Sequence, residues 1–210
     1  MAAVTAQMVK SLRELTGVGM MDCKKALAEC DGNEEKAITY LREKGLSKAA
    51  KKAGRATSEG LIGSYMHSNG KLSAIVEIRC ETDFVAKSDQ FIQLTKDVAM
   101  QVAATSPLCV SPDELPQDVL EKERAIYLQQ AIEEGKPANI AEKIVDGRIK
   151  KYYKEVCLLE QPFIKDDKKS IKDILNETIA ILGENMQIGR FARINLAETA
   201  NGAAEEAEEE

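Results

Sequence analysis

Residues 61–79, LIGSYMHSNGKLSAIVEIR, have the pattern of a β-hairpin and decide the fold class of this chain. On both sides of Asn69-Gly70 the side chains alternate between two sets, the period expected of strands with one buried face. Asn-Gly is the strongest two-residue signal for a hairpin turn, because both residues tolerate positive φ angles. We therefore predict two antiparallel strands joined by a tight turn.

The remaining core elements are predicted from their periods. A third strand, with the same alternation, is expected from Met186 to Asn195. The apolar faces of two helices are Phe91, Leu94, Val98 and Val102 after a cap at Ser88, and Ile171, Ile174, Leu175 and Ile179 after Ser170. These elements predict an α+β core in which about three antiparallel strands carry helices on one face. Residues 156–164, which include Pro162, suggest an irregular edge segment.

A pair of helices is predicted between these elements. Ser111-Pro112-Asp113-Glu114 is a capping box with proline at the first helical position, and the helical pattern runs from Asp118 to Glu134. Gly135-Lys136-Pro137 breaks this pattern, and a second helix follows to about residue 153. Helices joined by so short a turn must run antiparallel, so we predict a protruding helical hairpin over residues 118–153.

Residues 1–45 predict a small domain of three short helices. Thr5 caps the first helix, Gly17 ends it, and its apolar face is Met8, Val9, Leu12 and Leu15. The second helix is expected at about 22–30. Asn33 caps the third helix and Gly45 closes it.

The rest of the chain divides by composition. Residues 46–59 are rich in lysine and alanine and predict a basic helical linker rather than a phosphate contact. The α+β core is assigned to residues 60–197. Residues 198–210 are dominated by glutamate and predict a disordered tail, because like charges repel and no apolar face is present.

The composition excludes several function classes. The chain has 210 residues and a net charge of −6, with 44% hydrophobic and 30% charged residues, as in ordinary globular proteins. No apolar run approaches the ~18–20 residues that cross a bilayer, and the first residues do not resemble a secretory signal. We expect a cytoplasmic protein that binds no membrane and, being acidic, no nucleic acid directly.

Groups for catalysis or metal binding are scarce. The five cysteines form no C-x-x-C pair and His67 is the single histidine, so we expect reduced thiols and no metal site. The sequence has no phosphate-binding Gly-x-x-x-x-Gly-Lys-Ser/Thr loop and no dinucleotide fingerprint. One histidine excludes most catalytic triads. We predict an interaction protein without a cofactor, not an enzyme.

Two segments are candidate contact sites. Residues 16–27, TGVGMMDCKKAL, form a predicted corner between helices, and residues 81–87, ETDFVAK, place one of four phenylalanines in a connector after a strand. Connectors carry binding residues disproportionately. Adjacent helical residues face different sides, so we expect one of Met20 and Met21 in the core and the other exposed.

These segments resemble the bacterial elongation factor Ts family, the guanine-nucleotide exchange factors for elongation factor Tu. The resemblance includes residues 8–14, 16–27, 41–45, 48–54, 81–87 and 161–163, and extends over nearly the whole chain apart from the tail. It implies that the three-helix domain is ubiquitin-associated-like and docks on the G domain of elongation factor Tu. The residues at the matching positions are Arg13, Val18, Met20, Met21 and Lys24.

The resemblance also implies that Asp83 and Phe84 intrude near the magnesium and phosphate site of that partner, and we expect the neighbouring Thr82 and Val85 to bind the partner as well. Nucleotide is held largely through its phosphates and magnesium, so an inserted aromatic side chain that shifts this site opposes nucleotide binding. Because such coupling is reciprocal, GDP would leave faster and GTP would later expel the exchange factor. The alternative is that Phe84 is a core residue that anchors the connector.

Residues 63–67 resemble a hairpin in the second core subdomain of long family members, whereas the Asp-Phe element belongs to their first subdomain. The chain therefore resembles a short form with both motifs in one subdomain. We hypothesise a homodimer that forms a two-to-two complex, in which His67 contacts a distal domain of elongation factor Tu. A plain turn histidine is an equal alternative, and the helical hairpin would be an accessory docking or dimer contact.

Two other function classes remain open. A ubiquitin-associated-type adaptor without exchange activity would need no intruding Phe84. An RNA-binding factor that uses the basic residues 44–55 is disfavoured by the acidic balance and by the lack of aromatic residues in that stretch.

Overall fold

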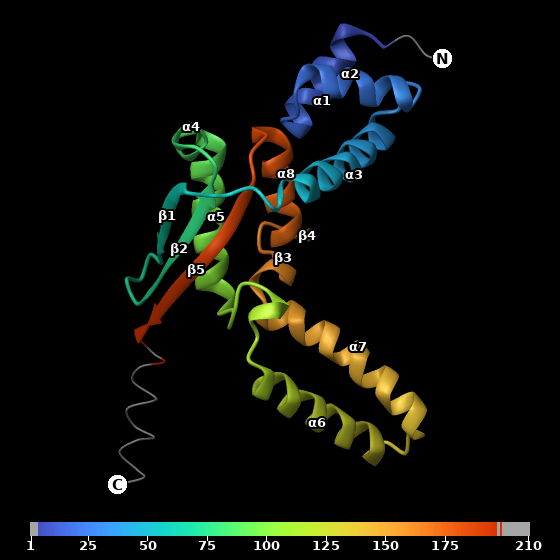
Figure 1. Cartoon of the computed structure of the whole chain (residues 1–210), viewed down its shortest axis with the longest axis vertical. Coiled ribbons are helices and arrows are strands. Elements are labelled where there is room, and N and C mark those ends of the chain that lie inside the picture. Colours follow the sequence, from blue (N-terminus) through green and yellow to red (C-terminus); the bar gives the residue numbers. More distant parts are fainter. Residues whose placement is uncertain (1–3, 197, 199–210) are drawn as a thin grey trace. The chain divides into compact units, whose positions relative to one another are not determined.

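The computed structural model describes residues 4–196 and 198 (Figure 1). The elements, in chain order, are α1 (Ala6–Thr16), α2 (Met20–Glu29), α3 (Glu34–Lys52), β1 (Glu59–Met66), β2 (Leu72–Cys80), α4 (Asp83–Ala86), α5 (Asp89–Thr105), the 3-10 helix η1 (Pro112–Glu114), α6 (Gln117–Glu133), α7 (Ala138–Val156), the 3-10 helix η2 (Leu158–Glu160), β3 (Pro162–Phe163), β4 (Asp166–Ser170), α8 (Ile171–Leu182) and β5 (Met186–Asn195). Apart from Glu198, the predicted tail lies outside the described residues.

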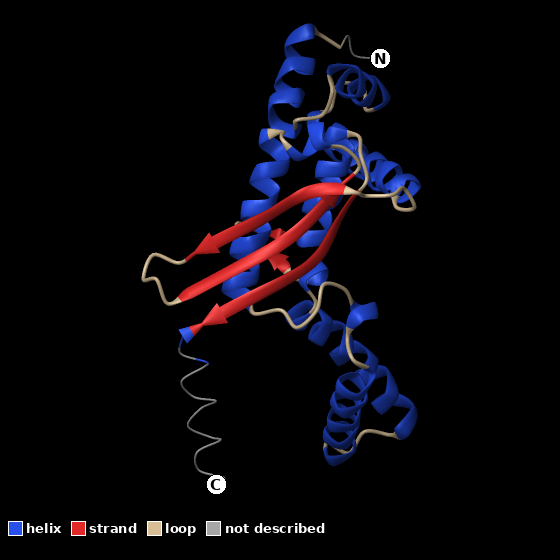
Figure 2. Cartoon of the chain, turned by 60° about the vertical axis from the view of Figure 1, so that its left-hand side comes forward, coloured by secondary structure: helices blue, strands red, loops and turns tan. Residues whose placement is uncertain are grey.

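The main sheet has three antiparallel strands in the order β1-β2-β5 (Figure 2). At the β1–β2 turn, the N–H of Gly70 donates to the His67 carbonyl at 2.8 Å, and Gly70 has a φ of +68°. The strand alternation follows the sequence, since Ala74 and Val76 are buried while Ile75 is exposed. The predicted α+β class, the hairpin and the final strand are confirmed.

Two details between residues 106 and 170 go beyond the predictions. Pro162 and Phe163 form β3, a two-residue strand that pairs with β4 in a separate two-stranded sheet with an irregular register, within the irregular edge segment expected at residues 156–164. The capping box at Ser111 opens only the 3-10 turn η1, and α6 begins later, after Pro116. Pro116 lacks a backbone N–H and pre-sets φ, so it suits the start of a helix.

The contacts divide the chain into two compact units. The first contains α1 to α3, α4, the start of α5 and most of α8. The second contains most of the main sheet, the rest of α5, the hairpin of α6 and α7, and β3 with β4. The domain boundaries expected from the sequence, at residues 45 and 59, stay a prediction.

In the first unit, α1, α2 and α3 pack around a small apolar core. Its buried members are Val9, Leu12, Cys23, Ala26, Leu27, Ala37 and Leu41. The predicted caps are confirmed: the Thr5 hydroxyl accepts from the Met8 N–H, the Asn33 carboxamide oxygen accepts from the Lys36 N–H, and Gly17 ends α1 with a φ of +67°.

Two predictions for this bundle are wrong. Gly45 does not close the third helix, which continues to Lys52. A Cβ atom at Gly45 would lie 3.2 Å from Cβ of Ala180 on α8, so the glycine permits close helix packing instead of ending the helix. Leu15, expected on the apolar face of α1, is 66% exposed.

In the second unit, α5 lies close against the sheet at Gly63. A Cβ atom there would lie 2.5 Å from the carbonyl oxygen of Thr95, so this position of β1 requires glycine. The predicted antiparallel pairing of α6 with α7 is confirmed, and ion pairs join the two helices: Arg124 lies 2.6 Å from Asp146, and Arg148 lies 2.9 Å from Glu134.

The root of this helical hairpin is held by backbone and side-chain contacts. The Leu158 N–H donates to the Cys109 carbonyl at 3.0 Å, and the two thiols of Cys109 and Cys157 lie 3.5 Å apart. Beside them, the buried carboxamide of Gln161 accepts hydrogen bonds from Gln101 and Thr105. The hairpin is therefore anchored to α5 through polar groups as well as apolar packing.

Candidate partner-binding site

The segment after β2 displays an apolar side chain to solvent. Phe84 lies on α4, which is a single helical turn rather than an irregular connector, and 84% of its surface is exposed. Thr82 caps this turn, since its hydroxyl accepts from the Val85 N–H at 3.4 Å. Ala86 is buried and Val85 is half-buried, so α4 is fixed on one side and free on the other. The alternative that Phe84 is a core residue is wrong.

Asp83 and Lys87 form an ion pair along α4, with Nζ of Lys87 2.7 Å from Oδ2 of Asp83. The hydrogen bond and the positive charge of Lys87 lower the pKa of Asp83 below its ordinary value. The pair is largely exposed. The carboxylate can therefore exchange Lys87 for a group on a partner at little cost in desolvation.

One glutamate that sequence reasoning missed, Glu184, holds this segment through hydrogen bonds. Glu184, between α8 and β5, accepts from the Thr82 hydroxyl at 2.6 Å, from the Thr82 N–H at 3.0 Å and from the Glu81 N–H at 3.2 Å. In the opposite direction, Oε1 of Glu81 accepts from the Asn185 N–H at 2.6 Å. About one hundred residues separate the partners, so no local pattern could indicate the contact.

A second exposed apolar surface lies at the corner of α1 and α2. Met20 is 48% exposed and Met21 is 78% exposed, so the expectation that one of them fills the core is wrong. The inward positions of α2 are taken by Cys23, Ala26 and Leu27. Leu15, which sequence reasoning placed in the core, is exposed as well.

Polar groups surround this corner. Arg13 and Lys24 are exposed, and Val18 is half-buried with its carbonyl accepting from the Cys23 thiol at 3.4 Å. We name the exposed residues Arg13, Leu15, Met20, Met21 and Lys24 around this corner the corner patch. It combines apolar area with two positive charges, a composition suited to a protein partner with an apolar, acidic surface.

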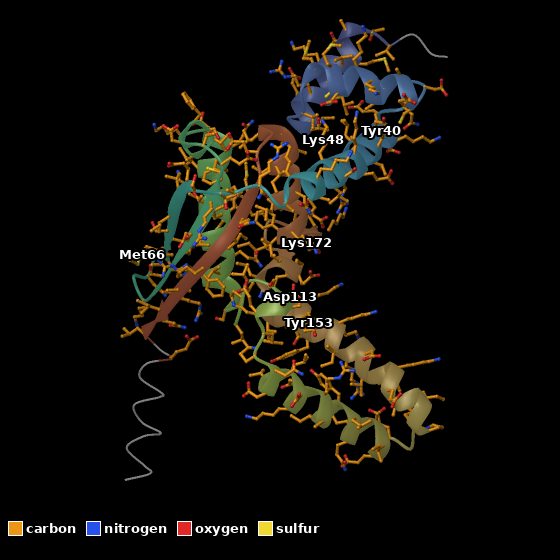
Figure 3. All side chains as sticks on the ribbon, in the orientation of Figure 1. Tyr40, Lys48, Met66, Asp113, Tyr153 and Lys172 are labelled. Carbon is orange, nitrogen blue, oxygen red and sulfur yellow. The ribbon has the colours of Figure 1, made fainter. Side chains whose placement is uncertain are left out.

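Asp22 braces the corner instead of joining the patch. Lys48 and Lys44 on α3 lie 2.9 Å and 3.5 Å from its carboxylate (Lys48 is labelled in Figure 3). The hydrogen bond from Lys48 is the main cause that lowers the pKa of Asp22, against a smaller opposing effect of burial. Two lysines of the predicted basic stretch therefore serve an intramolecular contact, which leaves less free charge for a phosphate ligand.

His67 is exposed in the β1–β2 turn, where its Nδ1 lies 3.2 Å from the hydroxyl of Tyr65. It belongs to the second unit, whereas the corner patch and residues 82–85 belong to the first. The other predicted contact residues therefore belong to one unit and His67 to the other.

Among residues 4–196 and 198, no group of three or more histidine, cysteine, aspartate or glutamate side chains could hold a metal ion. No helix within this described part is long and apolar enough to cross a bilayer.

Comparison with known proteins identifies relatives over the whole described chain. The model of a family described as Elongation factor TS matches residues 2–198. An Elongation factor Ts of Maridesulfovibrio salexigens is 80% identical over 208 residues, which is 99% of this chain and 100% of the relative. The Elongation factor Ts of Solidesulfovibrio magneticus is 67% identical over 95% of this chain and all of the relative, and that of a Thermoanaerobacter species is 57% identical over 93% and 96%.

Proposed function

The chain belongs to the elongation factor Ts family, the translation elongation factors that act in nucleotide exchange, and we propose from this that it binds GDP-bound elongation factor Tu and promotes GDP release. GTP then rebinds and displaces the exchange factor. The chain performs no bond chemistry in this scheme and needs no cofactor. Its place of action is the cytoplasm, where translation occurs.

The observation that carries the proposal is the exposure of Phe84 on a braced helical turn. A free protein does not gain stability by showing 84% of a phenylalanine to water, whereas burial in a partner removes that area from solvent. Inserted between packed elements near the magnesium and phosphate site, the ring would shift the backbone that holds the phosphates. Asp83, Thr82 and Val85 would accompany it into the contact.

The corner patch is proposed as the docking surface for the G domain. Met21 and Leu15 provide flexible and branched apolar area, and methionine adapts its shape to a partner. Arg13 and Lys24 would add charge complementarity, which affects association rate more than affinity. Docking by the patch and insertion by Phe84 are then separate contributions that two sets of variants can distinguish.

The direct test is stopped-flow release of a fluorescent GDP analogue from elongation factor Tu. We expect Phe84→Ala to lower the rate enhancement at least ~10-fold, which corresponds to about 1.4 kcal/mol of lost stabilisation of the nucleotide-releasing complex. Ile164→Ala, which truncates a 43% exposed apolar residue in the loop between β3 and β4, is the matched control, and GDP release in its presence should proceed at the wild-type rate. Equal rates for both variants would contradict the proposal and favour a binding adaptor.

We also propose that two copies pair through the outer face of the sheet. Exposed apolar residues gather on its strands in the second unit: Ile62, Met66, Ile75 and Ile194, with Leu196 just after β5 (Met66 is labelled in Figure 3). A second copy offers the same apolar face, as a two-fold interface requires. His67, next to this face, would then contact a distal domain of elongation factor Tu.

Light scattering at micromolar concentration tests the pairing. We expect twice the 23.0 kDa mass of one chain for the wild type, and one chain mass for Ile62→Lys with Ile194→Lys. Ile164→Lys, at an exposed apolar position in the loop between β3 and β4, is the control and should leave the mass unchanged. A 23.0 kDa wild type with full exchange activity would contradict the homodimer.

A further inference from the structure

We infer that Glu184 is a positioning residue for exchange, which acts by holding the Thr82–Phe84 turn in the shape that presents Phe84. The inference rests on the proposed function, because it assigns a role in presenting the side chain that the proposal places in the partner. Glu184 itself lies beneath the turn, at the junction of α8 and β5, and contacts the turn only through Glu81 and Thr82.

The first support is the number of hydrogen-bond donors that the Glu184 carboxylate accepts from. Three hydrogen bonds end on Glu184: two from successive backbone N–H groups, of Glu81 and Thr82, and one from the Thr82 hydroxyl. Hydrogen bonds to an ionised carboxylate are about twice as strong as neutral ones. The carboxylate therefore fixes both the backbone before α4 and the rotamer of its capping residue.

The rotamer of Thr82 matters because its hydroxyl makes two hydrogen bonds. It donates to Oε1 of Glu184 at 2.6 Å, and the same oxygen accepts from the Val85 N–H at 3.4 Å. That second bond caps α4. Without Glu184, the hydroxyl is free to rotate and donate elsewhere. The turn then keeps only its few backbone bonds, such as those from Ala86 N–H to the Thr82 carbonyl at 3.2 Å and from Lys87 N–H to the Asp83 carbonyl at 3.1 Å, together with the exposed Asp83–Lys87 pair.

The second support is that Glu184 is itself held. The Asn185 N–H donates to Glu81 at 2.6 Å, so the two segments brace each other in both directions. The Asn185 side chain is 2% exposed, and its Nδ2 donates to the carbonyls of Ala53 and Arg55 at 3.3 Å and 2.8 Å. Because these bonds hold residues 184 and 185 in place, the segment between α8 and β5 is a rigid support for the turn that presents Phe84.

A rigid turn raises the exchange rate by removing an ordering step. A turn that is disordered before contact must be ordered in the complex, and that cost is subtracted from the insertion of Phe84. We expect Glu184→Ala to lower the maximal GDP release rate by ~10-fold, and Glu184→Gln, which keeps one accepting oxygen, by only ~3-fold. The protein concentration for half-maximal effect should change less, because the corner patch is intact.

A double-mutant cycle separates positioning from general damage to the fold. If Glu184 acts through Phe84, Glu184→Ala should have less than ~2-fold further effect in a Phe84→Ala background, since coupled residues are not additive. Gln187→Ala is the matched control, because it removes only an exposed hydrogen bond between Thr57 and the same stretch of chain. The GDP release rate with Gln187→Ala should equal that with the wild type. Circular dichroism of every variant verifies that it is folded.

The outcomes test the proposed function and the positioning role separately. If Phe84→Ala promotes GDP release from elongation factor Tu as fast as the wild type does, the proposed function fails. The proposed function stands but the positioning role is overturned in two cases. In the first, Phe84→Ala slows GDP release while Glu184→Gln promotes it at the wild-type rate. In the second, the fold-losses in release rate of Glu184→Ala and Phe84→Ala multiply in the double variant. Should Glu184→Ala not fold, the same cycle with Glu184→Gln gives the decision.

Discussion

The ammonium group of Lys87 lies 2.7 Å from the carboxylate of Asp83, one helical turn away, beside the most exposed phenylalanine surface of the described chain. Lys87 gives Asp83 its hydrogen bond and its nearest positive charge, and both lower the pKa of that carboxyl group. A folded-state pKa below the unfolded one means that the pair contributes at neutral pH and is lost as pH falls through the folded-state pKa.

Replacement of Lys87 tests this assignment. In Lys87→Met we expect the pKa of Asp83 to rise toward the value of about 3.9 for an unperturbed aspartate. An NMR titration of the side-chain carboxyl carbon measures it directly. Lys122→Met, which removes a similarly exposed i, i+4 pair with Asp118, is the control and should leave the Asp83 titration unchanged. An unaltered pKa in Lys87→Met would show that Lys87 is not the cause.

The carboxamide of Gln161 is the main polar anchor of the helical hairpin. It is 2% exposed and bonds to Gln101 at 3.2 Å, to the Thr105 hydroxyl at 2.7 Å and to the Glu155 carbonyl at 2.7 Å. Gln161→Leu keeps the volume and leaves buried partners unsatisfied, so we expect a loss of about 1–3 kcal/mol in the free energy of unfolding.

Urea denaturation measures this loss. The control is Gln117→Leu, which breaks a single exposed bond to Glu121 and should change the unfolding free energy by less than about 0.5 kcal/mol. If the two variants lose the same stability, the carboxamide network does not anchor the hairpin.

The elements that sequence predicted well are those with a strong local signal. Asn69-Gly70 fixed the hairpin, the alternation in residues 186–195 fixed β5, and Thr5 and Asn33 marked helix starts, because each pattern lies within a few residues. Gly45 was misjudged because its reason for being glycine is Ala180, 135 positions away in sequence. Local helix rules cannot include a contact of that kind.

The candidate site also contains features that local sequence predicts and features that depend on distant contacts. The exposure of Phe84 was predictable, since a lone aromatic residue in a connector is a departure from local expectation. The bracing by Glu184 and Asn185 was not, because it depends on hydrogen bonds between segments that only the fold brings together. Both methionines at the corner are exposed because Cys23, Ala26 and Leu27 already fill the inward positions of α2.

Replacing Gly63 or Gly147 by alanine should change the free energy of unfolding in opposite directions. Gly63→Ala places a methyl group 2.5 Å from the Thr95 backbone oxygen, which cannot yield as a flexible side chain would. We expect a loss of about 1–3 kcal/mol in the free energy of unfolding, as for other overpacked cores. Gly147 is a helical residue of α7 with nothing within 4 Å of a Cβ atom, so Gly147→Ala should gain up to about 1 kcal/mol from helix propensity.

Denaturation curves of the two variants give the comparison within one protein. A neutral Gly63→Ala would mean that α5 and β1 are not as closely packed as the structure shows. A destabilising Gly147→Ala would mean that its position is covered by something else, for example a second copy of the chain.

The buried thiols give a pH-dependent prediction. Burial, and the hydrogen bond in which the Cys157 thiol keeps its proton beside Cys109, raise the pKa of Cys157 to about 12. In the unfolded chain a thiol loses its proton near pH 8.5. Between these two values the unfolded state has released the proton and the native state has not, so the free energy of unfolding falls as pH rises.

We therefore expect the wild type to lose more stability between pH 8 and pH 10.5 than Cys157→Ala does, although the variant starts from a lower value because it leaves a small cavity. Urea denaturation at both pH values measures the two differences. Cys30→Ala, at the half-buried cysteine of the first unit, is the control and should follow the wild-type slope more closely than Cys157→Ala does. Equal slopes for the wild type and Cys157→Ala would mean that Cys157 ionises in the native state nearly as readily as in the unfolded chain, which its burial beside Cys109 argues against.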